Sequence, residues 1–301
     1  MKHFAEALTK AEKVVICVLL SLCVFSCTKD DEPETEMSET VIHVDVNSDP
    51  IQEHVTINFA PIYTMEPMTR SDLSASGMTR LDVWLFDGET EIAAVHQTST
   101  DVGFGSVSQN LNKTKTYTLY AIAHKATDAC ILADGIISWP DDKVKESFFY
   151  TTTFSPATAS TLNCAMSRIT GKFTLQTTDA VPDNVDHMRF VIKDTGTRFN
   201  VSGTPANIID RTVDFASISR KTDGTTSFAF QILSTSDAPT NFEITATSYA
   251  SDNSIIETKT FDAVPIRNNY RTTYSGAFFT TSAMSLTFTA DEWNDYDTIN
   301  F

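Results

Sequence analysis

The chain has 301 residues and a formal net charge of −17, and 41% of its residues are hydrophobic. That is enough apolar material for a real core, and at about 100–200 residues per domain it predicts one large or two modest domains. The acidic balance argues against nucleic acid as a partner, because phosphate binding needs a basic surface.

Residues 1–26 are typical of a lipoprotein signal peptide. Lysines at positions 2, 10 and 13 precede a run of twelve mostly apolar residues, 14–25. At about 1.5 Å of rise per residue this run is about 18 Å long, which is short of the roughly 30 Å hydrocarbon core of a bilayer. A short apolar run behind basic residues indicates the h-region of a signal peptide.

The sequence Val24-Phe25-Ser26-Cys27 resembles a bacterial lipobox, with an aliphatic residue, a small residue and a cysteine at the three decisive positions. Cys27 is therefore the expected lipidation site, and several acyl chains on one cysteine would anchor the protein stably in a membrane. Phe25 departs from the small residue that is usual at its position. Cys23 is the competing site, but the leucine before it is too large.

Residues 27–40 form an acidic tether without apolar periodicity, and this composition predicts a disordered spacer. Asp30, Asp31 and Glu32 follow Cys27 closely, which resembles the export signal of surface lipoproteins in Bacteroidetes-type bacteria. A merely solvated spacer is the alternative. The expected location is the outer membrane, with the protein lipid-anchored and exposed on the cell surface.

Alternation of apolar and polar residues with a period of two predicts β-strands through the rest of the chain. Residues 80–96 are the clearest case, because alternating apolar residues flank Asp87-Gly88, a typical hairpin turn. Residues 115–124 are apolar on both faces, which predicts a central strand. Further strands are expected at 54–63, 168–177, 187–194, 226–233, 241–250, 255–261, 270–279 and 284–290.

The fold expected from these strands is all-β, with two β-sandwiches in tandem. A Ser/Thr-rich stretch at 151–161 interrupts the alternation and is the candidate junction, so the predicted domains are 41–160 and 161–301. The one helix expected is a short one near residues 141–149.

The sequence contains no catalytic constellation. It has no nucleophile elbow, P-loop or dinucleotide-binding fingerprint, and the histidines at 43, 54, 96, 124 and 187 lack metal-ligand spacing. The acidic residues within 291–301 lack the glycine turn of a calcium loop. We therefore predict no enzymatic activity, no cofactor and no metal, although carboxylate pairs can lie far apart in sequence.

Two cysteines remain after the signal peptide and Cys27. Cys130 and Cys164 would lie in a compartment that permits disulfides. A disulfide between them and two buried free thiols are both open, and the residues alone do not decide between them.

Four stretches carry a resemblance to the fimbrillin-type fimbrial subunits of Bacteroidetes-type bacteria, especially their membrane-anchoring and accessory members. They are the lipobox with its acidic tether and the segments 79–92, 164–185 and 263–279. A final strand with a late tryptophan, 285–293, agrees. The resemblance implies two transthyretin-like (Ig-like Greek-key) β-sandwich domains and assembly by β-strand addition, in which main-chain hydrogen bonds give affinity.

In stalk subunits of that family an Arg-specific protease removes the lipidated N-terminus with the first strand, and a neighbour's segment fills the vacated groove. Arg70 and Arg80 are the first arginines after Cys27 and thus the implied cleavage sites. The alternative is that Arg70 lies in an ordinary surface loop. An uncleaved subunit would stay lipid-anchored and offer one assembly interface, as an anchor does.

The expected function is that of a non-enzymatic outer-membrane lipoprotein that anchors or joins a cell-surface fimbria. Its partners would be other fimbrial subunits, docked at edge strands, the first and the last, with host or bacterial surface ligands as further candidates. A protease-matured stalk or tip subunit is one alternative. A surface glycan-binding lipoprotein of a nutrient-uptake system is another, which aromatic side chains exposed on one face would favour.

Overall fold

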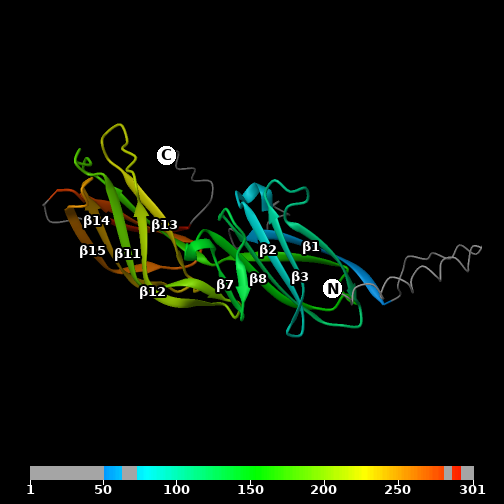
Figure 1. Ribbon diagram of the computed structural model, residues 1–301. Helices are drawn as coiled ribbons and strands as arrows, with labels where there is room; N and C mark the ends of the chain where they lie inside the picture. The colour runs from blue at the N-terminus through cyan, green and yellow to red at the C-terminus, as the bar shows by residue number, and fades with distance from the viewer. Residues whose placement is uncertain (1–50, 63–72, 281–286, 293–301) are drawn as a thin grey trace, which may run out of the picture. The chain divides into compact units, whose positions relative to one another are not determined.

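The computed structural model describes residues 51–62, 73–280 and 287–292 (Figure 1). All of them belong to one compact unit, Ser48–Phe301. The predicted signal peptide, Cys27, the tether and Arg70 lie outside the described residues. Within the described ranges, no helix is long and apolar enough to cross a membrane.

The described chain is all-β, which confirms the predicted class. Two short 3-10 helices, η1 (Leu73–Ser76) and η2 (Pro140–Asp142), interrupt the strands. The strands are β1 (Gln52–Ile62), β2 (Arg80–Asp87), β3 (Thr90–Thr98), β4 (Ser106–Asn112), β5 (Tyr117–His124), β6 (Ile131–Ala133), β7 (Ile136–Ser138), β8 (Ser147–Phe154), β9 (Thr161–Arg168), β10 (Thr170–Thr177), β11 (His187–Asn200), β12 (Thr204–Phe215), β13 (Ser227–Leu233), β14 (Thr240–Tyr249), β15 (Ile255–Ile266), β16 (Tyr270–Gly276) and β17 (Thr287–Glu292).

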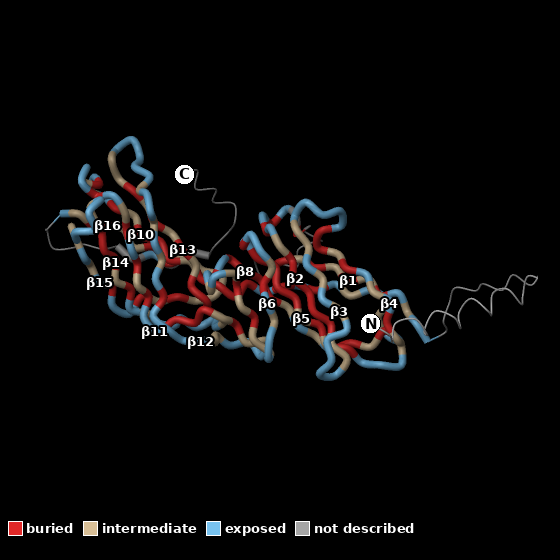
Figure 2. Tube along the Cα trace, in the orientation of Figure 1, coloured by how far each residue is buried: buried red, intermediate tan, exposed pale blue. Residues whose placement is uncertain are grey.

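A seven-stranded sheet holds the strands in the order β3-β2-β5-β8-β9-β1-β4. Both halves of this sheet contribute inward side chains to one apolar core, for example Ile57 of β1 and Leu119 of β5. The ladder between β8 and β9 covers only two residue pairs. We infer that the sheet bends there and folds over on itself, which gives a sandwich-like arrangement. Buried residues follow the middle of β2 and β5 (Figure 2).

Two more sheets enclose a second core. One has four strands in the order β13-β10-β16-β17, and the other has the order β15-β14-β11-β7-β6, with β12 paired to the other side of β11. Phenylalanines at alternate positions of β10, β11 and β13 fill this core, among them Phe173, Phe190, Phe228 and Phe230. Their ring centroids lie 5.2–6.3 Å apart, within the range in which aromatic pairs attract.

A third core links the first sheet to the others. The hairpin β6–β7 lies between β5 and β8 in sequence, but β7 pairs with β11. Its residues Ile137 and Leu132 pack with Trp84 and Phe149 on the outer face of the seven-stranded sheet. The chain passes from the seven-stranded sheet to the four-stranded sheet between Arg168, the last residue of β9, and Thr170, the first residue of β10.

Most predicted strands are confirmed, and the predicted helix is wrong. The 80–96 hairpin turns at Gly88 with φ of 62°, and the strand predicted to be central, β5, lies between β2 and β8. Residues 141–149 instead contain the end of η2 and the start of β8, because Asp141 and Asp142 adopt positive φ. Of the Ser/Thr-rich stretch, Thr151, Thr152 and Thr153 belong to β8, and residues 155–160 form the short connection from β8 to β9 within the same sheet.

Candidate functional site

The predicted cleavage residue Arg80 opens strand β2. Its backbone pairs with Thr98 of β3 and His124 of β5, and its Nε donates a hydrogen bond to the carbonyl of Thr127 at 2.9 Å. The next residue, Leu81, is fully buried. The bond after Arg80 therefore lies inside a strand paired on both sides.

Cys130 and Cys164 are both free and buried. They belong to different cores: Cys164 to the inner core of the seven-stranded sheet and Cys130 to the core on its outer face. Of the two alternatives left open by the sequence, the structure has two free thiols. Burial raises the pKa of the Cys164 thiol to about 12. Burial, and then the negative charge of Asp82, also raises the pKa of Cys130 strongly.

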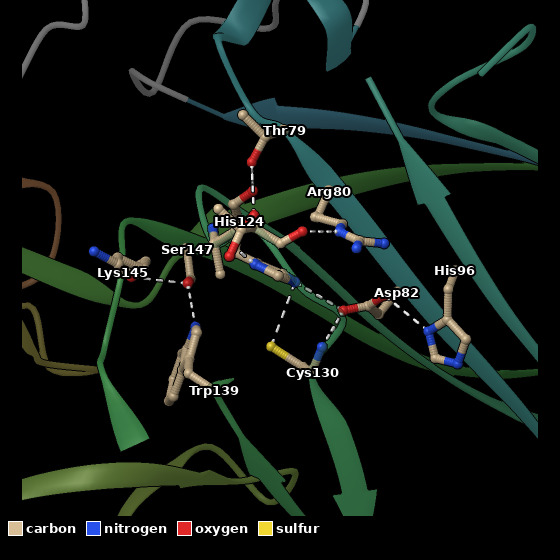
Figure 3. A network of polar contacts seen from close by, with 11 residues as sticks. Thr79, Arg80, Asp82, His96, His124, Cys130, Trp139, Lys145 and Ser147 are labelled. Carbon is tan, nitrogen blue, oxygen red and sulfur yellow. Dashed lines mark hydrogen bonds and ion pairs between the residues drawn. The ribbon is translucent and has the colours of Figure 1, made fainter. Parts of the chain in front are cut away.

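The most concentrated polar cluster of the described chain surrounds Asp82, a fully buried carboxylate on β2 (Figure 3). His96 lies directly across on β3, and its Nδ1 donates to Asp82 Oδ1 at 2.8 Å. His124, at the end of β5, places its Nε2 2.7 Å from Asp82 Oδ2. The backbone N–H of Cys130 donates to the same oxygen at 2.7 Å. Asp82 thus accepts hydrogen bonds from three separate segments.

The cluster has the residue types of a Cys-His-Asp catalytic triad but not its geometry. The backbone N–H of Ala126 donates to His124 Nδ1 at 3.2 Å, so the imidazole carries its proton on Nε2 and donates it to Asp82. The Cys130 Sγ lies 3.4 Å from that same Nε2. In a catalytic triad the thiol and the acid face different ring nitrogens. With its pKa raised by burial, this thiol is a poor nucleophile.

The same residues do not fit a metal ion either. One ligand atom from each of Asp82, His124 and Cys130 lies within 4.8 Å of the others. However, a metal on His124 Nε2 would move the proton to Nδ1, where the N–H of Ala126 already points. The thiol would also have to ionise against its burial and the charge of Asp82.

The arrangement is suited to holding the loop that leads into β6. Thr79 Oγ1 donates to the carbonyl of Ala126 at 3.0 Å, and Arg80 binds that of Thr127. Asp82 then fixes the backbone of Cys130. The sequence prediction missed this cluster, because its members come from separate strands. The available signal was an aspartate between two apolar residues in a predicted strand.

The predicted docking strands are placed differently from each other. β1 is not an edge strand: it lies between β4, with which it is antiparallel, and β9, with which it is parallel. Its residues Val55, Ile57 and Phe59 are buried in the first core. The prediction that β1 is an edge strand was wrong because apolar and polar residues alternate in the same way on an edge strand and on a strand paired on both sides. β17 lies at the edge of the four-stranded sheet.

Comparisons with known proteins identify a family and a fold. A family model described as "Family of unknown function (DUF6562)" matches residues 129–299. No curated protein gives a significant match. Among solved structures, a candidate adhesin from Bacteroides ovatus has a TM-score of 0.53 at 10% identity, over 78% of this chain and 96% of its own.

Two further structures are similar. Candidate polysaccharide binding proteins (DUF1812) from Bacteroides thetaiotaomicron have a TM-score of 0.52 at 12% identity, over 81% of this chain and 99% of theirs. The fimbrial anchor protein Mfa2 from Porphyromonas gingivalis has a TM-score of 0.48 at 12% identity, over 80% and 98%. At these identities the two likenesses above 0.5 indicate a shared fold, and the third is too distant to support an argument.

Proposed function

The chain belongs to the Family of unknown function (DUF6562), whose model matches more than half of its residues, and we propose that it is a non-enzymatic, lipid-anchored subunit of a cell-surface fimbria. Lipidation would be at Cys27, and residues 28–40 would hold the strands off the outer membrane. The observation that carries this proposal is a lipobox-like sequence ahead of an all-β chain whose fold resembles that of a candidate adhesin. We also propose that the two main cores correspond to two transthyretin-like sandwiches.

The position of β1 determines what cleavage would change in a protease-matured stalk or tip subunit. Cleavage after Arg70 would remove β1 and expose the slot between β4 and β9. Withdrawing Val55, Ile57 and Phe59 from the core would cost about 5–9 kcal/mol, at roughly 1.5–3 kcal/mol for each buried side chain. A matured subunit would therefore need a replacement strand. In the uncleaved chain β1 itself fills the slot, so no neighbour's strand can enter there.

Of the two arginines, Arg70 is the one at which we propose that any maturation would occur. Cleavage after Arg80 would require β2 to leave both of its neighbouring strands. An uncleaved chain would dock the next subunit at an edge strand, and β17 is the proposed one.

Gene deletion in the bacterium of origin tests the anchor role. We expect fimbriae that are shed into the medium or lost, with attachment restored by the wild-type gene but not by a Cys27→Ala variant. Normal and firmly attached fimbriae in the deletion strain would contradict the proposal. The variant separates a failure of anchoring from a failure of folding, because Cys27 lies ahead of every described strand.

A further inference from the structure

We propose that the outer face of β4, β1 and β9 binds a neutral polysaccharide. The outward positions of these strands are all exposed or half-buried and alternate with the buried positions of the first core. They are Gln52, His54, Thr56, Asn58, Ala60 and Ile62 on β1, Ser106, Ser108, Asn110 and Asn112 on β4, and Thr161, Asn163, Ala165 and Ser167 on β9. We call this set the polar face.

The polar face has no Asp, Glu, Lys or Arg. Such residues make up 20% of the chain, which has a net charge of −17. The charged residues that β1 and β9 do contain, Glu53 and Arg168, occupy positions of the opposite, inward parity. Charged groups attract ligands of opposite charge and reject ligands of like charge. A face without them, on an otherwise acidic protein, is complementary to an uncharged ligand.

Cross-strand hydrogen bonds hold the side chains of the polar face in place. Ser106 Oγ donates to Asn58 Oδ1 at 3.0 Å, and Asn58 Nδ2 donates to Asn163 Oδ1 at 3.2 Å. This row crosses all three strands, and the backbone register places its members side by side. Amides and hydroxyls both donate and accept, which is what a ligand rich in hydroxyl groups requires. Side chains that are already ordered lose less entropy on binding.

A second row has the same character. Thr56 Oγ1 lies 3.4 Å from Ser108 Oγ, and His54 Nδ1 lies 2.8 Å from Asn110 Oδ1. Successive rows along a strand are about 6.8 Å apart, and neighbouring strands about 4.8 Å apart. The polar face is therefore a regular grid of hydrogen-bonding groups, and a polymer of repeating sugar units can use several of its rows at once.

A protein partner fits this face less well. The cores of protein interfaces are enriched in Tyr, Trp, Phe, Met and Arg and depleted in Ser. None of the enriched types occurs on the polar face, and its apolar members are confined to one end, at Ala60, Ala165 and Ile62. The face also has no Phe, Trp or Tyr side chain on which a sugar ring could stack, so sugar binding would rest on its hydrogen-bonding rows, with the small apolar end contacting the C–H groups of the ring. Nucleic acid is disfavoured because the face has no cation.

This inference goes beyond the proposed function, because it depends neither on lipidation nor on fimbriae. It does depend on β1, which supplies the middle strand of the polar face. The uncleaved chain therefore has the complete face, and a chain that lost β1 would lose it.

Binding of the full mature protein, purified in a mild detergent, to an array of polysaccharides tests the proposal. The array would hold neutral glucans, mannans, galactans, xylans and fructans, with alginate as an acidic comparison. Ser108→Lys puts a charge into the middle of the polar face. Thr260→Lys is the matched control, because Thr260 also forms a cross-strand hydroxyl pair, with Thr245 at 3.1 Å on β14 and β15. Thermal unfolding checks that both variants are folded.

We expect the wild type and Thr260→Lys to bind at least one neutral polysaccharide and not alginate, and Ser108→Lys to bind it at least tenfold more weakly. Asn58→Ala, which removes the amide in the middle of the first row, should weaken binding in the same way. Absence of binding to every neutral polysaccharide, or equal binding by Ser108→Lys, would overturn the proposal. So would a dimer of the wild type that Ser108→Lys dissociates, since the face would then serve a second copy of the chain.

Discussion

Replacement of Asp82 tests whether the buried cluster holds the loop into β6. In Asp82→Ala, two fully buried donors lose their acceptor: His124 Nε2 and the backbone N–H of Cys130. An orphaned buried donor costs about 1–3 kcal/mol, so the pair predicts a loss of about 2–6 kcal/mol in the free energy of unfolding. His96 adds little, because its side chain is 40% exposed and can turn to water. Removing a buried carboxylate offsets part of this cost.

Urea denaturation of the wild type and the variant at neutral pH measures this loss. Asp128→Asn is the control: it lies in the same loop, is exposed, and accepts a hydrogen bond from Thr127 Oγ1 at 3.2 Å. It should change stability by no more than about 0.5 kcal/mol. A thiol reagent gives a local readout, since Cys130 should become reactive in Asp82→Ala well before Cys164 does. A loss below about 1 kcal/mol, or equal labelling of both thiols, would refute the reasoning.

Three further results are expected. Glu146→Ala removes the carboxylate that binds buried Arg168 at 2.9 Å, and a denaturant titration should show the free energy of unfolding lowered by about 3–5 kcal/mol. A loss of about 1 kcal/mol or less, as for an exposed ion pair, would contradict the burial of this pair. Gly171→Ala should lower the free energy of unfolding by about 3 kcal/mol, because the added Cβ would meet the backbone carbonyl of Arg267. In Gly88→Ala the added Cβ meets nothing within 4 Å, so only the strain of the positive φ lowers the free energy of unfolding, by about 1 kcal/mol. Equal effects would show that the close approach at Gly171 is wrong. Because burial raises the pKa of Cys164 from 9.0 to about 12, its thiol ionises first in the unfolded chain, and stability falls as pH rises above 9. Relative to Cys164→Ala the wild type should lose about 1 kcal/mol between pH 8 and pH 10, and parallel pH profiles would contradict this.

The sequence was sufficient to predict the strands that have one buried face and one exposed face. Leu81, Val83 and Leu85 alternate around a turn at Gly88, and that hairpin forms as predicted. Phe228 and Phe230 alternate within the predicted strand 226–233, and both are buried. In such strands the burial of one face decides the register, so local alternation carries the information.

Pairings between distant segments could not be predicted in this way. Nothing in residues 136–138 indicates that they pair with β11, some sixty residues later, because a short strand has no partner-specific pattern. The parallel pairing of β1 with β9 likewise joins segments more than a hundred residues apart. The Asp82 cluster joins residues that lie 42 and 48 positions apart in the chain, and histidine spacing in the sequence could not indicate it. Threonines on the exposed side of β8 resembled a linker because a solvated strand face and a loop share their composition.

The most direct test of the central claim is the intact mass and N-terminal peptide of the protein extracted from outer membranes. The proposed anchor predicts a chain that begins at an acylated Cys27 and still contains β1. A chain that begins at Ser71, without β1, would contradict it and would place the protein among the subunits that mature by cleavage and strand replacement.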